Sequence, residues 1–279
     1  MDQKTKMVIT DLDGTLLNDE QEVNKRDKET LQRLKELNIV RVIATGRNYF
    51  SLSRVLSPSF PVDYLIFSSG AGILNWHTKK LIYSSYLIKE KVAEIARFFI
   101  DHKVDFMIHE VIPNNHKFVY HDSGSHNPDF ERRCQLYKEF AEPLNPSTET
   151  YDHACQILAV SGKSPEFYNY VLNKIKGVKI IRATSPLDGE SVWIEIFPED
   201  VSKGHGVERL CSLLDIHKSQ TLGIGNDYND LDLLNYTAKS FVVDNAPLEI
   251  KEHFLSCKSN TDCGFTDAVN QEIFNNQSS

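Results

Sequence analysis

Residues 7–15 read MVITDLDGT, and this stretch decides the fold. Its apolar first half stops abruptly at a charged turn that contains glycine, as expected of a short buried strand. The following segment predicts a helix, because Asn24 can cap its first turn, Asp27 follows three residues later and leucines recur at helical spacing. The chain therefore begins as a strand, a polar loop and a helix.

This alternation continues and, after an interruption, resumes. Further strands are expected at 39–44, 64–67, 192–197, 221–224 and 241–243. A helix capped by Ser202 is expected among the later strands. Strands that alternate with helices pair in parallel through right-handed crossovers. The sequence thus predicts an α/β protein whose doubly wound, Rossmann-like core comprises residues 1–83 and 188–279.

The interruption, residues 84–187, predicts a separate inserted α/β module. It contains an amphipathic helix at 90–102 and a strand at 156–161, and Ser164 with Pro165 suits the start of another helix. Residues 112–130 are rich in polar residues and proline, which favours a long loop. The histidines in and near this stretch are interpreted as solvated loop residues rather than metal ligands: His109, His116, His121 and His126.

Composition narrows the function classes. The 279 residues are 41% hydrophobic and 25% charged, as in an ordinary globular protein. A net charge of -8 with dispersed basic residues argues against nucleic acid as a partner. No apolar run approaches a bilayer's thickness and no signal peptide is evident, so no membrane association is expected. Five cysteines without CxxC spacing indicate reduced thiols in a cytoplasmic protein. The oligomeric state stays open.

Polar clusters stand at the predicted strand ends or at a helix start. They are Asp11 with Asp13, Thr45 with Gly46, Lys203, and residues 226–230. In open α/β sheets ligands bind at the carboxyl ends of strands, so clusters distant in sequence can converge. Carboxylates alone would repel a phosphate. With Mg²⁺ they become ligands of an oxygen-preferring cation that can also hold a phosphate oxygen.

These motifs resemble those of the haloacid dehalogenase-like phosphatases. Residues 11–15 look like the first motif, and Thr45, Lys203 and residues 226–230 follow in the order of the second, third and fourth. An insertion between the second and third motifs is typical of the branch with a C2-type cap. The SSGA sequence at 68–71 and VSKG at 201–204 resemble the Cof-type subfamily in particular.

The resemblance implies a role for each motif residue. Asp11 would be the nucleophile that forms an aspartyl-phosphate, and Asp13 the general acid and base. Thr45 would donate a hydrogen bond to a phosphoryl oxygen, and Lys203 would neutralise developing charge. Asp230 would orient Lys203. Substrate contacts are implied at Gly46, Ser69, Gly70 and Asn229. Arg47 is interpreted as a surface ion-pairing residue outside the catalytic set.

The metal site departs from the family pattern. Mg²⁺ would use the Asp11 carboxylate and the backbone carbonyl of Asp13, together with the fourth motif. The family reads Gly-Asp-x-x-Asn-Asp there, whereas alignment at the end of this motif puts Asn226 in the aspartate position, with Asp227 next to it. Either residue could complete the site.

The expected function is Mg²⁺-dependent hydrolysis of phosphate monoesters of small metabolites, with sugar phosphates favoured. Two alternatives remain open at this level. The same nucleophile could serve a phosphotransferase or phosphomutase, or the protein could be a catalytically weak regulator that binds a phosphorylated metabolite. The cap, expected to act as a lid that sets substrate specificity, offers no pattern that identifies the substrate.

Overall fold

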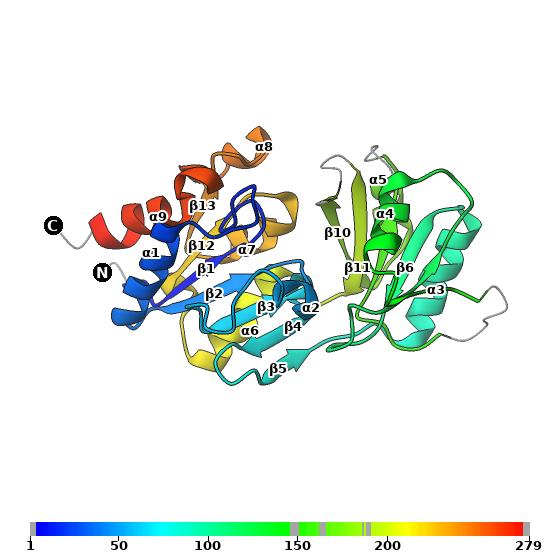
Figure 1. Cartoon of the computed structure of the whole chain (residues 1–279), viewed down its shortest axis with the longest axis horizontal. Coiled ribbons are helices and arrows are strands. Elements are labelled where there is room, and N and C mark those ends of the chain that lie inside the picture. The colour runs from blue at the N-terminus through cyan, green and yellow to red at the C-terminus, as the bar shows by residue number, and fades with distance from the viewer. Residues whose placement is uncertain (1–3, 146–150, 162–165, 186, 188–190, 276–279) are drawn as a thin grey trace. The chain divides into compact units, whose positions relative to one another are not determined.

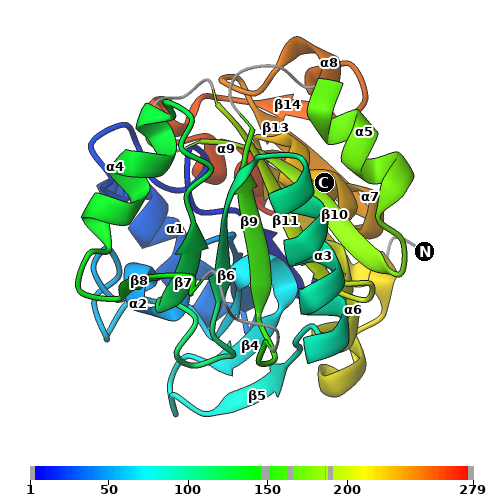
Figure 2. The same ribbon diagram turned by 90° about the vertical axis from the view of Figure 1, so that its right-hand side faces the viewer.

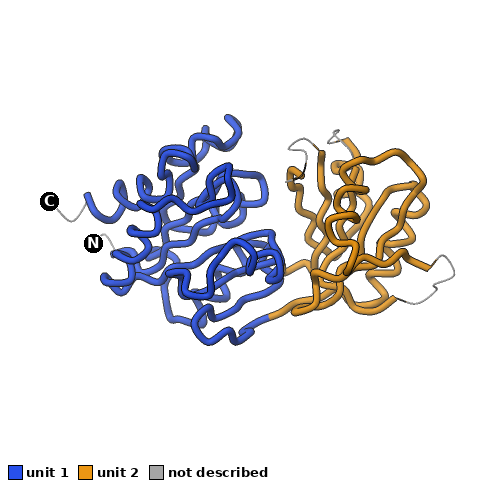
Figure 3. The backbone as a smooth tube through the Cα atoms, in the orientation of Figure 1, with its two compact units in different colours: residues 1–83, 202–279 blue, residues 84–201 orange. Residues whose placement is uncertain are grey.

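The chain forms two compact units, residues 1–83 with 202–279, and residues 84–201 (Figure 3). The computed structural model describes residues 4–145, 151–161, 166–185, 187 and 191–275. No helix in these ranges is both long enough and apolar enough to cross a membrane.

The first unit contains an eight-stranded sheet that is parallel from β14 through β3 (Figure 1). In spatial order its strands are β14 (Leu255–Cys257), β13 (Lys239–Val243), β12 (Thr221–Gly225), β1 (Met7–Thr10), β2 (Val40–Ala44), β3 (Tyr64–Phe67), β4 (Gly72–Asn75) and β5 (Leu81–Ser84). β4 runs antiparallel to β3. The order reverses direction at β1, which is the topological switch point where open α/β sheets bind ligands.

Helices cover both faces of this sheet. One face packs on α6 (Lys203–Leu214) and α7 (Leu231–Tyr236), through alternate residues of the strands such as Met7, Ile9 and Val42. The other face carries α1 (Lys25–Glu36), since the intervening residue Arg41 donates to the Leu31 carbonyl. The other α-helices that the structure describes in this unit are α2 (Tyr49–Leu52), α8 (Leu248–Lys251) and α9 (Gly264–Val269). This confirms the predicted doubly wound core.

The start of α1 is held differently from the prediction. Asn24 occupies the N-cap position but makes no side-chain cap hydrogen bond, and instead donates to the Asn260 carbonyl. Asp27 is fully buried, and its Oδ1 accepts from the backbone N–H and the hydroxyl of Thr266 on α9. Tertiary contacts between α1 and α9 therefore replace the local capping that the sequence suggested.

The second unit is built on a six-stranded sheet with helices on both faces (Figure 2). Its strands, in spatial order, are β10 (Val178–Thr184), β11 (Val192–Pro198), β9 (Gln156–Val160), β6 (Asp105–His109), β7 (Phe118–His121) and β8 (Ala141–Pro143). α3 (Lys89–Asp101) and α5 (Glu166–Lys174) pack on the face that contains Phe106. α4 (Pro128–Leu136) packs on the face that contains Met107. All pairings are antiparallel except that of β7 with β8.

The second boundary of the insertion differs from the expected one. It lies after Val201 rather than after residue 187, because β11 pairs with β9 and β10 of the second unit. Periodicity alone assigned this apolar strand to the core, and strand partners are not readable from periodicity. The first boundary of the structure falls after Tyr83.

The prediction of a loop at 112–130 is also wrong. This stretch contains β7, an interior strand of the sheet, and the first turn of α4. His109 lies just before it in β6 and is 2% exposed, with Nδ1 2.9 Å from the Asn115 carbonyl oxygen. Burial lowers the pKa of His109 to about 3, so it is a neutral core residue rather than a solvated one. The expected helix start at Ser164 and Pro165 lies outside the described residues.

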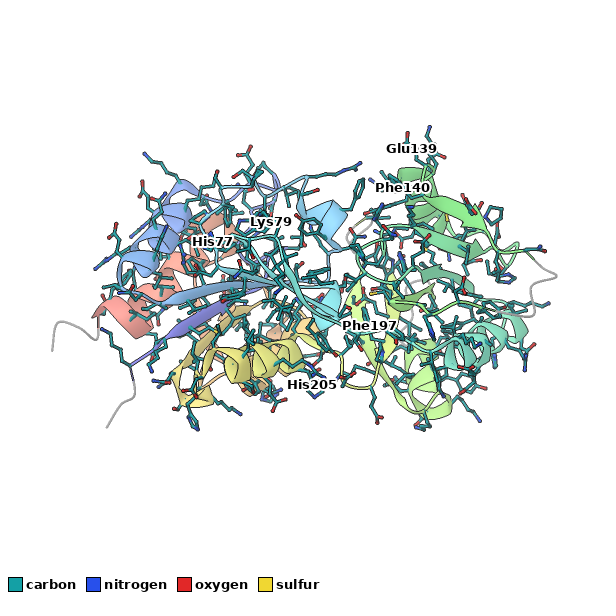
Figure 4. The ribbon with its side chains drawn as sticks, turned by 90° about the horizontal axis from the view of Figure 1, so that it is seen from below. His77, Lys79, Glu139, Phe140, Phe197 and His205 are labelled. Atoms are coloured by element: carbon teal, nitrogen blue, oxygen red, sulfur yellow. The ribbon has the colours of Figure 1, made fainter. Side chains whose placement is uncertain are left out.

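Two carboxyl groups of the first unit, the buried Asp27 and the half-buried Asp63, should respond oppositely to pH. Burial raises the pKa of Asp27, so ionisation opposes folding. At Asp63, burial opposes ionisation, but hydrogen bonds from Arg41 and a contact with His77 outweigh it and lower the pKa (Figure 4 labels His77).

We therefore expect the stability of the wild type, relative to Asp27→Asn, to fall as pH rises from about 3.8 through the raised folded pKa. Relative to Asp63→Asn, the stability of the wild type should rise with pH through the acid range, up to the unfolded value of 3.8. A tenfold difference in acid dissociation constant between the folded and unfolded states corresponds to about 1.4 kcal/mol. Urea unfolding of the three proteins across pH measures both trends, and parallel curves would contradict the assignment.

Candidate active site

Four neighbouring strands of the first unit deliver the predicted site residues to one edge of the sheet. Asp11 follows β1, Thr45 follows β2, residues 68–70 follow β3 and residues 226–230 follow β12. The strands are in register here, since Thr10 pairs with Ile43 of β2 and with Ile224 of β12. The Asp11 N–H continues the ladder by donating to the Ile224 carbonyl at 2.8 Å. Parallel pairing thus brings these clusters together.

Lys203 comes from the first turn of α6, and two close backbone approaches fix its position. Gly70, at φ +104°, lies so near Ser202 that a Cβ there would sit 2.1 Å from the Ser202 carbonyl oxygen. Gly204 faces α7, where a Cβ would sit 2.5 Å from the Asp232 carbonyl oxygen. The Ser202 hydroxyl accepts from the His205 N–H and caps the helix, as predicted. His205 is exposed (Figure 4), whereas Lys203 is 1% exposed and points inward.

The Lys203 ammonium bridges two buried carboxylates. Its Nζ donates to Asp11 Oδ1 and to Asp230 Oδ1, each at 2.7 Å, and lies 3.4 Å from Asn229 Oδ1. The second oxygen of Asp230 accepts from the backbone N–H groups of Asn226 and Asp227 at 2.8 and 3.1 Å. Asp230 is therefore held by Lys203 on one side and by two backbone N–H groups on the other.

The charges in this group do not balance, because one ammonium serves two carboxylates. Burial, followed by the charge of Asp230, raises the pKa of Asp11 to about 7, although Lys203 opposes both effects. The pKa of Lys203 is also raised, because the two carboxylates outweigh the effect of burial. An additional positive charge beside Asp11 would favour its ionised form. Strongly shifted pKa values of this kind cluster at functional sites.

The fourth motif distinguishes its two candidate metal ligands. Asn226 faces the first motif: Thr15 Oγ1 donates to Asn226 Oδ1 at 3.2 Å, and a Cβ on Gly14 would lie 2.6 Å from Asn226 Nδ2. Asp227 instead caps its own short helix by accepting from the Tyr228 N–H at 2.7 Å. Asn226 thus lies against Gly14 and Thr15 of the first motif, whereas Asp227 turns to its own backbone.

The predicted metal-binding residues fit a hard, oxygen-preferring cation. Asp11, the Asp13 carbonyl, the Asn226 amide oxygen and Asp227 offer oxygen donors only, which are the ligands that Mg²⁺ prefers. In the described part of the chain, no group of three His, Cys, Asp or Glu side chains is arranged to hold a metal.

Three of the four predicted substrate contacts lie together on the same edge of the sheet. A Cβ on Gly46 would sit 3.5 Å from Ser69 Oγ and 3.9 Å from Asn229 Nδ2. The Ser69 N–H donates to the Thr45 carbonyl at 3.0 Å, which joins this group to the second motif. Gly70, the fourth, serves packing against α6, as its close approach to Ser202 shows.

Arg47 forms an ion pair, as its interpretation expected, but its partner is a residue of the first motif. Its guanidinium binds Asp13: Nε lies 2.8 and 3.0 Å from the two carboxylate oxygens, and Nη2 lies 2.5 Å from Oδ1. The only sequence signal is its place directly after Thr45-Gly46, and that signal does not reveal its partner.

Comparison with known proteins now defines the class. Residues 8–269 match the family model of haloacid dehalogenase-like hydrolases, and the chain belongs to this family. Within it, the chain is of the Cof type predicted from its motifs. It is therefore an enzyme, a hydrolase.

Individual relatives are distant but match over most of their length. The 5-amino-6-(5-phospho-D-ribitylamino)uracil phosphatase YwtE of Bacillus subtilis is 24% identical, over 95% of this chain and 97% of its own. A haloacid dehalogenase-like hydrolase from Bacteroides thetaiotaomicron superposes with a TM-score of 0.74 at 22% identity, covering 96% and 99% of the two chains. The subclass IIB sugar phosphatase BT4131 superposes with a TM-score of 0.74 at 19% identity, covering 96% of this chain and 98% of its own. At these identities the structures establish a shared fold.

Removal of the bridging ammonium should destabilise the protein strongly. We expect Lys203→Met to lower the free energy of unfolding by about 3–5 kcal/mol, because Asp11 and Asp230 would stay buried without their cation. The loss should be larger at pH 8 than at pH 5. The folded pKa of Asp11, which is already raised, would then lie still further above its unfolded value, so stability would fall as pH rises.

Urea unfolding at both pH values measures this effect. The exposed residue Lys239 supplies the matched control Lys239→Met, which should change little. The double variant Lys203→Met, Asp230→Asn should recover part of the loss, because it removes one of the two like charges. A loss independent of pH and of Asp230 would mean that Lys203 acts through packing alone.

Proposed function

We propose that this hydrolase is a phosphatase that cleaves phosphate monoesters of small metabolites through an aspartyl-phosphate on Asp11. The observation that carries the proposal is the buried contact of Asp11 with Lys203, in which a carboxylate and a cation stand at the switch point of the sheet. The relatives named as phosphatases support the same reaction class.

In the first half-reaction, an Asp11 oxygen attacks phosphorus and the bond from phosphorus to the leaving oxygen breaks. Asp13, protonated at this stage, gives its proton to that oxygen. In the second half-reaction, water attacks the phosphorus of the aspartyl-phosphate and gives a proton to Asp13. The bond between Asp11 and phosphorus breaks, inorganic phosphate leaves and both carboxyl groups return to their initial states.

The other residues act on charge and position. Lys203 neutralises the negative charge that spreads onto the phosphoryl oxygens, and because Asp230 holds it in place it need not reorganise during the reaction. Thr45 and the backbone around Gly46 would donate hydrogen bonds to the same oxygens. Asp11, the Asp13 carbonyl and Asn226 would hold Mg²⁺, which would supply further positive charge against the phosphate.

The second unit is proposed to set substrate selectivity, with sugar phosphates as the favoured class in view of the sugar phosphatase neighbour. The cytoplasmic location expected from the cysteine spacing is part of the same proposal. Release of inorganic phosphate, rather than an isomeric phosphorylated product, separates the phosphatase from the alternative phosphomutase.

The decisive variant is Asp11→Asn. We expect it to fold, because the amide oxygen can still accept from Lys203, and to lose at least about 10³-fold in phosphate release because an amide is a poor nucleophile. The assay is inorganic phosphate release from a panel of sugar phosphates with and without Mg²⁺. The control is Asp262→Asn, which alters an exposed ion pair with Lys258.

A trapping experiment makes the covalent step visible. Acid-quenched wild type should carry label from a ³²P-labelled substrate, and Asp11→Asn should not. Full turnover or labelling of that variant would remove Asp11 from the mechanism.

The metal assignment is tested by calorimetric titration with Mg²⁺, independently of turnover. We expect Asn226→Asp to bind Mg²⁺ about tenfold tighter, because it adds an anionic oxygen, and Asn226→Ala to bind more weakly. Asp227→Asn is the matched control, because its amide oxygen can still accept from the Tyr228 N–H, and its affinity should change little. The opposite order of effects would transfer the ligand role to Asp227.

A further inference from the structure

The carboxylate of Asp13 is oriented by a partner that the motif pattern does not include. Its side chain is 37% exposed, so packing alone does not fix its direction. Every hydrogen bond that the structure gives to this carboxylate, in the described part of the chain, comes from Arg47. Two donors in a planar fork restrict both the position and the rotation of a carboxylate.

Arg47 is itself held at both ends. Its backbone N–H donates to Thr45 Oγ1 at 3.1 Å, and its carbonyl accepts from the Ser68 N–H at 2.9 Å. At the far side of the guanidinium, Nη2 also donates to the side-chain oxygen of Gln21, and Nη1 lies 3.4 Å from Ser51 Oγ. The guanidinium therefore lies between Gln21 and Asp13.

Gln21 stands on a short turn that the core fixes in place. Leu17 and Val23 form an antiparallel bridge at its base, and Gln21 adopts a left-handed conformation with φ 62°. The turn is closed by two backbone hydrogen bonds of Asn18, and Asn260 Nδ2 donates to the Leu17 carbonyl at 3.0 Å. The position of Gln21 is thus set by the fold, even though its side chain is exposed.

We propose that Gln21 and Arg47 are positioning residues that aim the Asp13 carboxyl group at the oxygen of the leaving group. This inference rests on the proposed acid–base role of Asp13. Transfer of a proton requires a heavy-atom separation near hydrogen-bond length, so a misdirected carboxyl loses the benefit of general acid catalysis, about 10²- to 10⁴-fold. An ordinary exposed ion pair has no such consequence.

The nature of the leaving group separates this role from others. A sugar alkoxide needs a proton as it departs, whereas p-nitrophenolate is a stable anion and leaves without one. We expect Arg47→Ala to lower kcat/KM for a sugar phosphate about 10²-fold and that for p-nitrophenyl phosphate less than about threefold. The loss should fall mainly on kcat.

Gln21→Ala should show the same selective loss at a smaller size, about fivefold on the sugar phosphate, since it only loosens Arg47. Arg47→Lys should lie between the wild type and Arg47→Ala, because it keeps the charge without the fork. The matched controls are Glu22→Ala on the same turn and Arg54→Ala near α2. Both should leave the ratio of the kcat/KM values for the two substrates unchanged.

A double variant tests whether Arg47 acts through Asp13. In an Asp13→Asn background, Arg47→Ala should lower kcat/KM for the sugar phosphate by less than about a further twofold, since the carboxyl group that Arg47 positions has already been removed. Equal losses on both substrates in Arg47→Ala would overturn the inference and place Arg47 at the phosphoryl group. If Arg47→Ala does not fold, Gln21→Ala and Arg47→Lys carry the same test.

The wild type distinguishes this inference from the proposed function. A wild type that releases phosphate from neither substrate would defeat the proposed function. If the wild type is active but its Gln21 and Arg47 variants keep the wild-type ratio of kcat/KM values for the two substrates, only the positioning role is defeated.

Discussion

The buried ammonium of Lys203 is the interaction on which the candidate site depends. It lies 2.7 Å from an oxygen of Asp11 and 2.7 Å from an oxygen of Asp230, and all three side chains are almost wholly excluded from solvent. One cation between two carboxylates leaves a net negative charge in a medium of low dielectric. Such a group remains ionised only if its geometry is maintained, so the surrounding fold must hold it rigidly.

The fold meets this requirement with backbone rather than with flexible side chains. Gly70 and Gly204 permit two close backbone approaches that fix the start of α6, and so the origin of the Lys203 side chain. Asp230 is held by two backbone N–H groups of its own turn. Asp11 extends from a strand paired on both sides. Each member of the charged group is therefore placed by hydrogen bonds or contacts of the main chain, which supports an electrostatic role for the site.

The net negative charge also gives a physical reason why an asparagine can stand at 226, where the family pattern has an aspartate. An aspartate there would add a further carboxylate against the first motif, in which the pKa of Asp11 is already raised to about 7. The amide offers an oxygen without that repulsion, and Thr15 orients it. A cation at this site would therefore be attracted less by the charge of its ligands. Its binding would depend more on oxygen atoms that are already held in position. The positive charge of Arg47 offsets the negative charge of Asp13, and the ion pair holds this second carboxylate of the first motif in a defined direction.

The sequence by itself determined the α/β class, the family and the set of motif residues. It could do so because the polar residues after apolar strands are local patterns, and parallel strands must bring their carboxyl ends to one edge. Only the tertiary structure decided which residues touch. It placed β11 in the second unit, made 112–130 part of a sheet, and paired Asp27 with Thr266 rather than with its own helix start. It also joined Arg47 to Asp13 and turned Asn226 toward Thr15. These outcomes depend on strand partners and on side-chain directions across long sequence separations, which periodicity and propensity do not encode.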